Sequence, residues 1–302
     1  MTSSEFSHCR SCGVPDFELG LISILCPTRE RPDNVIRLVD SIYSLKSFRG
    51  KVEILFFVDN DDNTFPFELS QKYPDKIKVI RGPRQWISNE HNILYNFAKG
   101  EILMTAGDDM VFQTKNWDQK VVDAFESFPD KIVLVYGDDK ATHRGKIAVH
   151  GFFHQHWVHV LGTWVQPGRG SAWDYWASEN ARLLGRLKFL SELEIAHIHF
   201  RQGERQAIFD NTYKFVYQSN RSFRPEITFK NLERERRNDR ILLRNAMNSN
   251  PPIERQYWLA ETLLKTKIAL DRNRALSMRN KEIFLAICSI PFKRVFSYLR
   301  HK

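Results

Sequence analysis

The stretch EILMTAGDDMVFQTKNWD, residues 101–118, places two acidic residues directly after an apolar run. Adjacent carboxylates repel each other, and burying them without partners is costly. Asp108 and Asp109 must therefore lie either in an exposed turn or beside a positive charge. An apolar run that ends in acids is typical of a buried strand whose exit faces a cleft.

The rest of the first half of the chain alternates between strand and helix patterns. Apolar runs predict further strands at 21–32, 52–62, 77–82 and 131–139. Helical spacing begins at Pro32 and recurs at 88–100 and 117–129, where a glycine and a proline mark the ends. This order predicts an open, mostly parallel α/β sheet.

Three of the predicted strands end in acid-rich turns, at 59–62, at 108–109 and at 138–139. Open α/β sheets bind ligands at the carboxyl ends of their strands. Several carboxylates gathered there need a cation, and oxygen ligands favour Mg²⁺ or Mn²⁺. The sequence therefore predicts a divalent cation at this edge of the sheet.

The net charge of +9 is concentrated at one end of the chain. Residues 230–302 contain 17 Lys and Arg against 7 Asp and Glu, whereas the first 229 residues contain 28 against 29. This distribution argues against a nucleic-acid groove on the main body. It indicates a basic appendage that meets an anionic surface, although helices packed on the domain or on a neighbouring subunit are the simpler alternative.

The compartment is predicted from what the sequence lacks. No apolar run is long enough to span a membrane, and the N-terminus does not resemble a signal peptide. Four cysteines are too few for a disulfide scaffold, so we expect a cytoplasmic protein. Cys9 and Cys12 form a CxxC beside His8, but no second pair follows at zinc-finger spacing, which favours a flexible terminus.

Residues 140–180 are rich in aromatic residues, histidines and glycines and show no clean periodicity. No histidine spacing there is diagnostic of zinc. Four tryptophans suit either a carbohydrate-binding wall or an ordinary core: Trp157, Trp164, Trp173 and Trp176. Residues 181–190 continue as helix and then strand, and 193–200 alternate as a strand that leads into a polar loop.

Residues 20–217 resemble a glycosyltransferase of the GT-A fold, close to family 2. ISILCPTRERP (22–32) resembles the first nucleotide-binding segment, and FFVDNDD (56–62) stands at the acidic turn that contacts the nucleotide. NEHNILYNFAKGEILMTAGDDMVF (89–112) resembles the run that ends in the metal-binding acidic motif. Residues 173–200 resemble the acceptor side. The resemblance implies a Rossmann-like sheet, as in nucleotide-diphospho-sugar transferases, with a helical C-terminal extension.

The resemblance also implies roles for individual residues. Thr28, Arg29 and Asp59 would line the nucleotide pocket, although the arginine could instead lie in a solvated loop. The metal motif reads Gly-Asp-Asp and not Asp-any-Asp, which makes Asp109 the metal ligand. Asp108 then lies nearer the ribose or supports the metal shell. A histidine of the later strand would add a ligand, and His199 is preferred over His197.

An inverting transfer needs a general base that takes the proton of the acceptor hydroxyl. Asp174 is the candidate, because it lies among aromatic residues at the start of a helix on the acceptor side. Glu179 is the alternative. Asp174 could also serve only to stabilise the helix dipole.

The sequence therefore predicts a metal-dependent, hexosyltransferase-type enzyme. It would move a sugar from a nucleotide-diphosphate sugar to a saccharide or lipid-linked acceptor, as in polysaccharide biosynthesis. The alternatives are a nucleotidyltransferase, which usually has a Gly-rich loop with a lysine, and a non-catalytic carbohydrate-binding protein. The expected domains are a flexible terminus (1–17), the GT-A domain (18–229) and a basic extension (230–302) that could touch the inner membrane face.

Overall fold

The structure is a computed structural model that describes residues 17–140, 146–165, 173–198, 210–214 and 232–247. The chain divides into two compact units, 1–251 and 252–302. The second unit lies outside the described residues, and so do the CxxC motif and most of the basic segment. The predictions of a membrane-contacting C-terminus and of a flexible N-terminus concern those parts of the chain.

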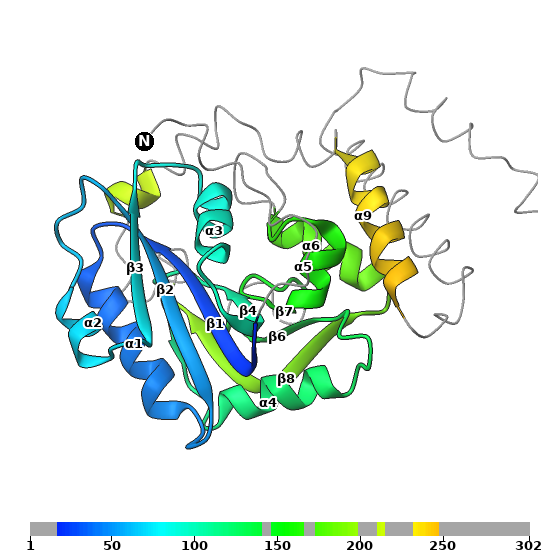
Figure 1. The fold of residues 1–302 in the computed structure, drawn as a ribbon, viewed down its shortest axis with the longest axis horizontal. Helices are drawn as coiled ribbons and strands as arrows, with labels where there is room; N and C mark the ends of the chain where they lie inside the picture. Colours follow the sequence, from blue (N-terminus) through cyan, green and yellow to red (C-terminus); the bar gives the residue numbers. More distant parts are fainter. Residues whose placement is uncertain (1–16, 141–145, 166–172, 199–209, 215–231, 248–302) are drawn as a thin grey trace, which may run out of the picture. The chain divides into compact units, whose positions relative to one another are not determined.

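One sheet of eight strands, in the order β3-β2-β1-β4-β7-β6-β8-β5, forms the centre of the first unit (Figure 1). Neighbours among the first four strands pair in parallel, as do β6 and β8, whereas β7 and β5 pair antiparallel to their neighbours. The strands are β1 (Glu18–Thr28), β2 (Lys51–Asp59), β3 (Ile77–Gly82), β4 (Gly100–Thr105), β5 (Met110–Phe112), β6 (Leu134–Asp138), β7 (Phe152–His154) and β8 (Leu187–His197). The predicted mostly parallel α/β sheet is confirmed.

Helices cover both faces of this sheet (Figure 1). One face packs against α1 (Pro32–Leu45), α2 (Glu68–Lys72) and α4 (Trp117–Glu126). The other packs against α3 (Ile87–Tyr95), α5 (Gln155–Leu161), α6 (Trp173–Leu183) and α9 (Glu233–Ala246). Side chains alternate between the two faces: Ile24 of β1 contributes to the first core, and Leu25 contributes to the second. Because both faces are covered, the central strands β1 and β2 contain long apolar runs, such as 54–58 in β2.

The short elements are those that the sequence analysis missed. β5 and β7 have three residues each and α2 has five, which is too little for a periodic pattern. The helix α5 lies within the aromatic region where no period was found. The longer predicted elements are present with shifts of a few residues at their ends, and the strand at 77–82 has the predicted bounds.

The helix α9 lies at the start of the segment 230–302, where a helical extension was expected, and it packs against α5 and α6. Its buried face is mostly polar. The Arg236 Nε donates to Glu179 Oε2 at 2.6 Å, and the Trp176 Nε1 donates to Asp239 Oδ2 at 2.7 Å. Glu179, the alternative general base, is thus engaged in a buried ion pair. The domain boundary expected at residue 230 stays a prediction.

None of the described helices is both long and apolar enough to cross a membrane.

A buried ion pair joins the segment before β6 to the segment before β8. The Arg186 Nη2 lies 2.9 Å from Asp130 Oδ2, and the two side chains are only 9% and 2% exposed. The other Asp130 oxygen accepts the backbone N–H of Ile132. Because removing one partner leaves a buried charge, we expect Asp130→Ala to lower the free energy of unfolding by about 3–5 kcal/mol.

Chemical denaturation followed by circular dichroism measures this change. The control is Glu18→Ala, which removes a carboxylate from an ion pair with Lys51 whose two side chains are 54% and 52% exposed. This exposed pair should contribute little. Equal effects of the two substitutions would contradict the prediction.

Candidate active site

The acidic residues singled out in the sequence meet where the parallel strands end. Thr28 is the last residue of β1 and pairs in register with Val58, the neighbour of Asp59 in β2. Asp108 and Asp109 follow β4, the strand on the other side of β1. The sheet therefore brings three separate segments of sequence to one edge, which is the usual ligand-binding edge of such folds.

Asp108 is buried and is held by the last residue of β1 and by one residue of the β1–α1 loop. It accepts a hydrogen bond from Thr28 Oγ1 at 2.7 Å and one from Arg31 Nη1 at 3.0 Å. Burial raises the pKa of Asp108 in spite of the positive charge of Arg31. The sequence analysis required either an exposed turn or a positive charge beside the acidic pair. Arg31 provides such a charge.

Asp109 is bound by residues from two later parts of the chain. Its Oδ2 lies 3.2 Å from His197 Nε2 and accepts the Tyr213 hydroxyl hydrogen bond at 2.6 Å. Burial alone would raise the pKa of Asp109, but the charge of His197 and both hydrogen bonds hold it below its ordinary value. In turn, Asp109 raises the pKa of His197 against the opposing effect of burial.

Local pairing explains why His197 reaches this position. It ends β8, where it pairs in register with Met110 of β5, the residue after Asp109. The backbone N–H of the next residue, Ile198, donates to the Asp109 carbonyl at 2.7 Å. His199 lies outside the described residues, so its role as a metal ligand stays a prediction.

His150 completes a group of three potential metal ligands with Asp109 and His197. One ligand atom from each residue lies within 4.8 Å of the others. Among the described residues, His150 Nε2 is buried and has no hydrogen-bond partner. A Cβ added at Gly107 would lie 2.7 Å from Asp109 Oδ1 and 3.6 Å from His150 Cε1, so glycine leaves the room that this group occupies. These residues fit a divalent cation.

A second acidic turn lies at the end of β2. Arg29 Nη1 donates to Asp59 Oδ2 at 2.8 Å, and the same guanidinium forms two bonds to Asp61. Asp62 instead supports the loop, because it accepts the backbone N–H of Glu30 at 2.8 Å. Asp59 Oδ1 is buried and has no hydrogen-bond partner in the described part of the chain. Burial raises the pKa of Asp59, although Arg29 opposes the shift.

A single helical turn at 211–214 lies against these groups. Arg31 pairs with Asp210 through two bonds of 2.6 and 2.9 Å and lies 4.3 Å from the centre of the Tyr213 ring. Thr212 Oγ1 donates to the Arg29 carbonyl at 3.3 Å. This turn therefore contacts both the arginine-bearing loop and the Asp109 carboxylate.

Asp174 lies in the first turn of α6 and is partly buried. Its Oδ1 accepts the backbone N–H of Tyr175 at 2.8 Å, as a helix N-terminal acid does. Burial raises the pKa of Asp174 to about 7, and the charge of His197 partly opposes this shift. A carboxyl group with such a pKa is suited to accept a proton near neutral pH.

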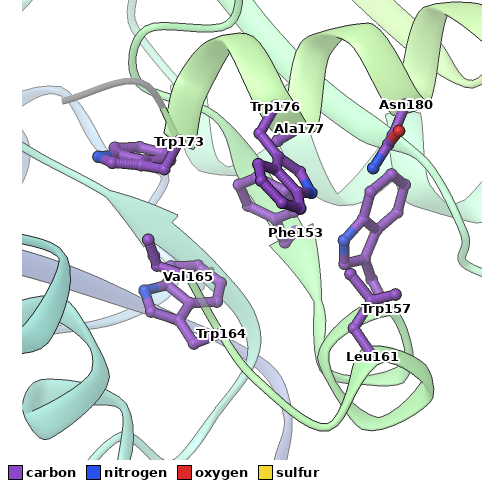
Figure 2. A pocket seen from close by; sticks show the side chains of 9 residues that line it. All are labelled: Phe153, Trp157, Leu161, Trp164, Val165, Trp173, Trp176, Ala177 and Asn180. Carbon is purple, nitrogen blue, oxygen red and sulfur yellow. The ribbon is translucent and has the colours of Figure 1, made fainter. Parts of the chain in front are cut away.

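Three of the four tryptophans belong to the core. Trp157, Trp164 and Trp176 are 2%, 5% and 8% exposed. With Trp173, they surround a small cavity between β7, α5 and α6 (Figure 2). Its volume of about 20 Å³ suits one water molecule and excludes a sugar ring. The three buried tryptophans therefore do not form a carbohydrate-binding wall, and the core interpretation is correct for them.

Sequence reasoning missed several residues that the fold brings to the site: His150, Asp210 and Tyr213. His150 stands in the stretch without periodicity, two residues before the three-residue strand β7. Asp210 and Tyr213 follow the histidine-containing strand by more than ten residues. The polar loop after that strand was the one feature of the sequence that pointed to them.

The comparison with family models agrees with this geometry. Residues 23–163 match the family described as glycosyl transferase family 2. The resemblance to family 2 glycosyltransferases of the GT-A fold is thus confirmed, and this segment contains the acidic turns and His150. His197 and Asp174 lie beyond it.

Solved structures similar to this chain include crystal structures of S. aureus TarS. TarS 1–349 in complex with UDP is 14% identical, with a TM-score of 0.46, and the match covers 57% of this chain and 59% of that chain. TarS 1–349 in complex with UDP-GlcNAc is 16% identical, with a TM-score of 0.45, and covers 57% of each chain. The chain spans less than two thirds of these proteins. The comparison with curated proteins gave no match.

Proposed function

We propose that this chain is a metal-dependent glycosyltransferase that moves a sugar from a nucleotide-diphosphate sugar to a hydroxyl acceptor with inversion. The observation that carries the proposal is the convergence of Asp59, Asp108 and Asp109 at one edge of the sheet, beside two arginines and a histidine. The family match supports the transferase class. The donor, the metal and the stereochemistry are proposals from the site.

Asp59 would contact the nucleoside. Its buried Oδ1 has no partner among the described residues, and such an oxygen favours an N–H of a base or an O–H of a ribose. Arg29 holds the other carboxylate oxygen and so fixes the orientation of the group. Thr28 and Arg31 orient Asp108, which would lie next to the ribose or to the metal shell.

Asp109 would hold the cation, Mn²⁺ or Mg²⁺, with a histidine of the β8 region as a further ligand. When bound, a divalent cation neutralises the charge that develops on the departing diphosphate. Without it, His197 and Tyr213 occupy one oxygen of Asp109. The chain thus keeps this carboxylate ionised and oriented.

Asp174 would act as the general base. It would accept the proton of the acceptor hydroxyl while the hydroxyl oxygen forms its bond to the anomeric carbon. The bond from that carbon to the diphosphate breaks, and its electron pair leaves with the nucleoside diphosphate. The charge of His197 acts on Asp174, which supports a place for both side chains near one site.

For the acceptor we propose a surface glycan or a lipid-linked saccharide, and for the place of action the cytoplasm or the inner membrane face. The excess of Lys and Arg after residue 230 supports an anionic docking surface.

Thermal unfolding of the full chain with a panel of nucleoside diphosphates, each with and without Mn²⁺, tests the nucleotide and metal sites together. A ligand that binds only the folded state raises the unfolding temperature. We expect Asp59→Asn to lower the affinity for the tightest-binding nucleotide by about 10- to 100-fold, the usual effect of losing a hydrogen bond to a charged group.

The matched control is Asp61→Asn, because Asp61 also bonds to Arg29 but is 69% exposed. An equal loss in both variants would show an effect through Arg29 and would contradict direct contact by Asp59. Product analysis separates the alternatives. A glycosyltransferase releases a nucleoside diphosphate from the sugar donor, a nucleotidyltransferase forms or consumes pyrophosphate, and a carbohydrate-binding protein does neither.

A further inference from the structure

The geometry points to His150 as a third protein ligand of the cation, so that the site has two imidazoles and one carboxylate. We infer that it selects Mn²⁺ or a similar transition-metal ion over Mg²⁺. The inference rests on the cation site of the proposed function and adds a ligand and a choice of metal to it.

The first argument is the environment of the His150 ring. Its Nε2 is buried and has no hydrogen-bond partner among the described residues. A buried polar atom without a partner is costly, and a metal ion bound through this nitrogen would satisfy it. Neutral imidazole is the commonest metal ligand and binds through one ring nitrogen.

The second argument is the approach of the three groups. The rings of His150 and His197 meet edge to face with centroids 4.8 Å apart. The ligand atoms of these rings and of Asp109 lie within 4.8 Å of one another. Two bonds of about 2.0–2.2 Å from a central ion span nearly this separation, so small side-chain rotations suffice. The missing Cβ at Gly107 leaves the Asp109 carboxylate and the His150 ring room to meet.

The third argument concerns the choice of metal. Mg²⁺ prefers oxygen ligands and retains most of its water, whereas imidazole suits transition metals. A site built only for Mg²⁺ would place carboxylates or carbonyls where the two imidazoles lie. Two histidines and one carboxylate therefore favour Mn²⁺, with its remaining positions open to diphosphate oxygens.

Pulsed electron paramagnetic resonance of Mn²⁺ bound to the full, tag-free chain tests the inference directly. Mn²⁺ is the probe because the thiolates of Cys9 and Cys12 select softer ions. We expect nitrogen couplings from two imidazoles in the wild-type protein and from one in His150→Ala. The Mn²⁺ affinity should fall at least tenfold in this variant, and the wild-type protein should bind Mg²⁺ at least tenfold more weakly than Mn²⁺.

His159→Ala is the matched control, because this histidine is exposed on α5 and should leave both the couplings and the affinity unchanged. The measurement on the wild-type protein does not depend on whether any variant folds. Coupling to a single imidazole, or equal affinity for Mg²⁺ and Mn²⁺, would overturn the inference even if sugar transfer is observed. Coupling to two imidazoles that His150→Ala reduces to one would uphold the site even if no nucleoside diphosphate is released.

Discussion

Replacing Asp109 by asparagine is expected to lower the rate of nucleoside diphosphate release by about 10²–10³-fold, the usual effect of removing one group that stabilises developing charge. The amide keeps the size of the side chain and loses the charge that faces His197 at 3.2 Å. Steady-state kinetics at several Mn²⁺ concentrations measure the loss. The apparent affinity for Mn²⁺ should fall as well, because the carboxylate is the one anionic member of the ligand group.

The control for this substitution is Asp123→Asn on the exposed face of α4. It removes the same charge far from the strand ends and should leave the kinetics unchanged. Wild-type rates in Asp109→Asn, with an unchanged dependence on Mn²⁺, would show that the cation is held elsewhere.

The second large effect is expected at Asp174. General-base catalysis contributes about 10²–10⁴-fold, so Asp174→Asn should reduce kcat by that amount with little change in KM for the donor. A base must be ionised to accept a proton. Because burial raises the pKa of Asp174 to about 7, wild-type activity should decline as the pH falls below about 7.

The pH profile of Asp174→Asn distinguishes a general base from a helix-capping acid. The residual activity of the variant should no longer decline through the pKa of Asp174, whereas a purely structural change would lower the whole profile and keep its shape. Glu179→Gln serves as the comparison, because its buried bond to Arg236 gives it a structural role. Loss of the acidic limb in that variant, with the limb kept in Asp174→Asn, would reverse the assignment.

The strands and the acids at their ends could be predicted because one physical constraint shaped both. A parallel strand covered on both faces favours a continuous apolar run, as in 54–58, and the polar residue that follows the run, Asp59, then marks its exit. Thr28 and Asp108 follow the same rule on the neighbouring strands. Their convergence required only the parallel order of the sheet.

The remaining part of the site depended on pairings with no local pattern. His150 gains its place from β7, a three-residue strand that aligns antiparallel with β4. Tyr213 reaches Asp109 from 104 residues away. The role of the tryptophans stayed open in the sequence for a related reason, since an aromatic side chain in an irregular stretch looks the same whether it faces solvent or, like Trp157, the interior.

The contacts of Arg31 with Asp108 and Asp210, and of His197 with Asp109, have a consequence for how a ligand binds at this site. Before any ligand enters, each of these charged side chains already has a partner of opposite sign. The negative charge of a nucleoside diphosphate and the positive charge of its metal ion also nearly cancel. Binding would therefore exchange one set of ion pairs for another, with little change in the net charge of the site. Long-range electrostatic attraction contributes little to such an exchange, so short-range contacts at the site determine which ligand is recognised.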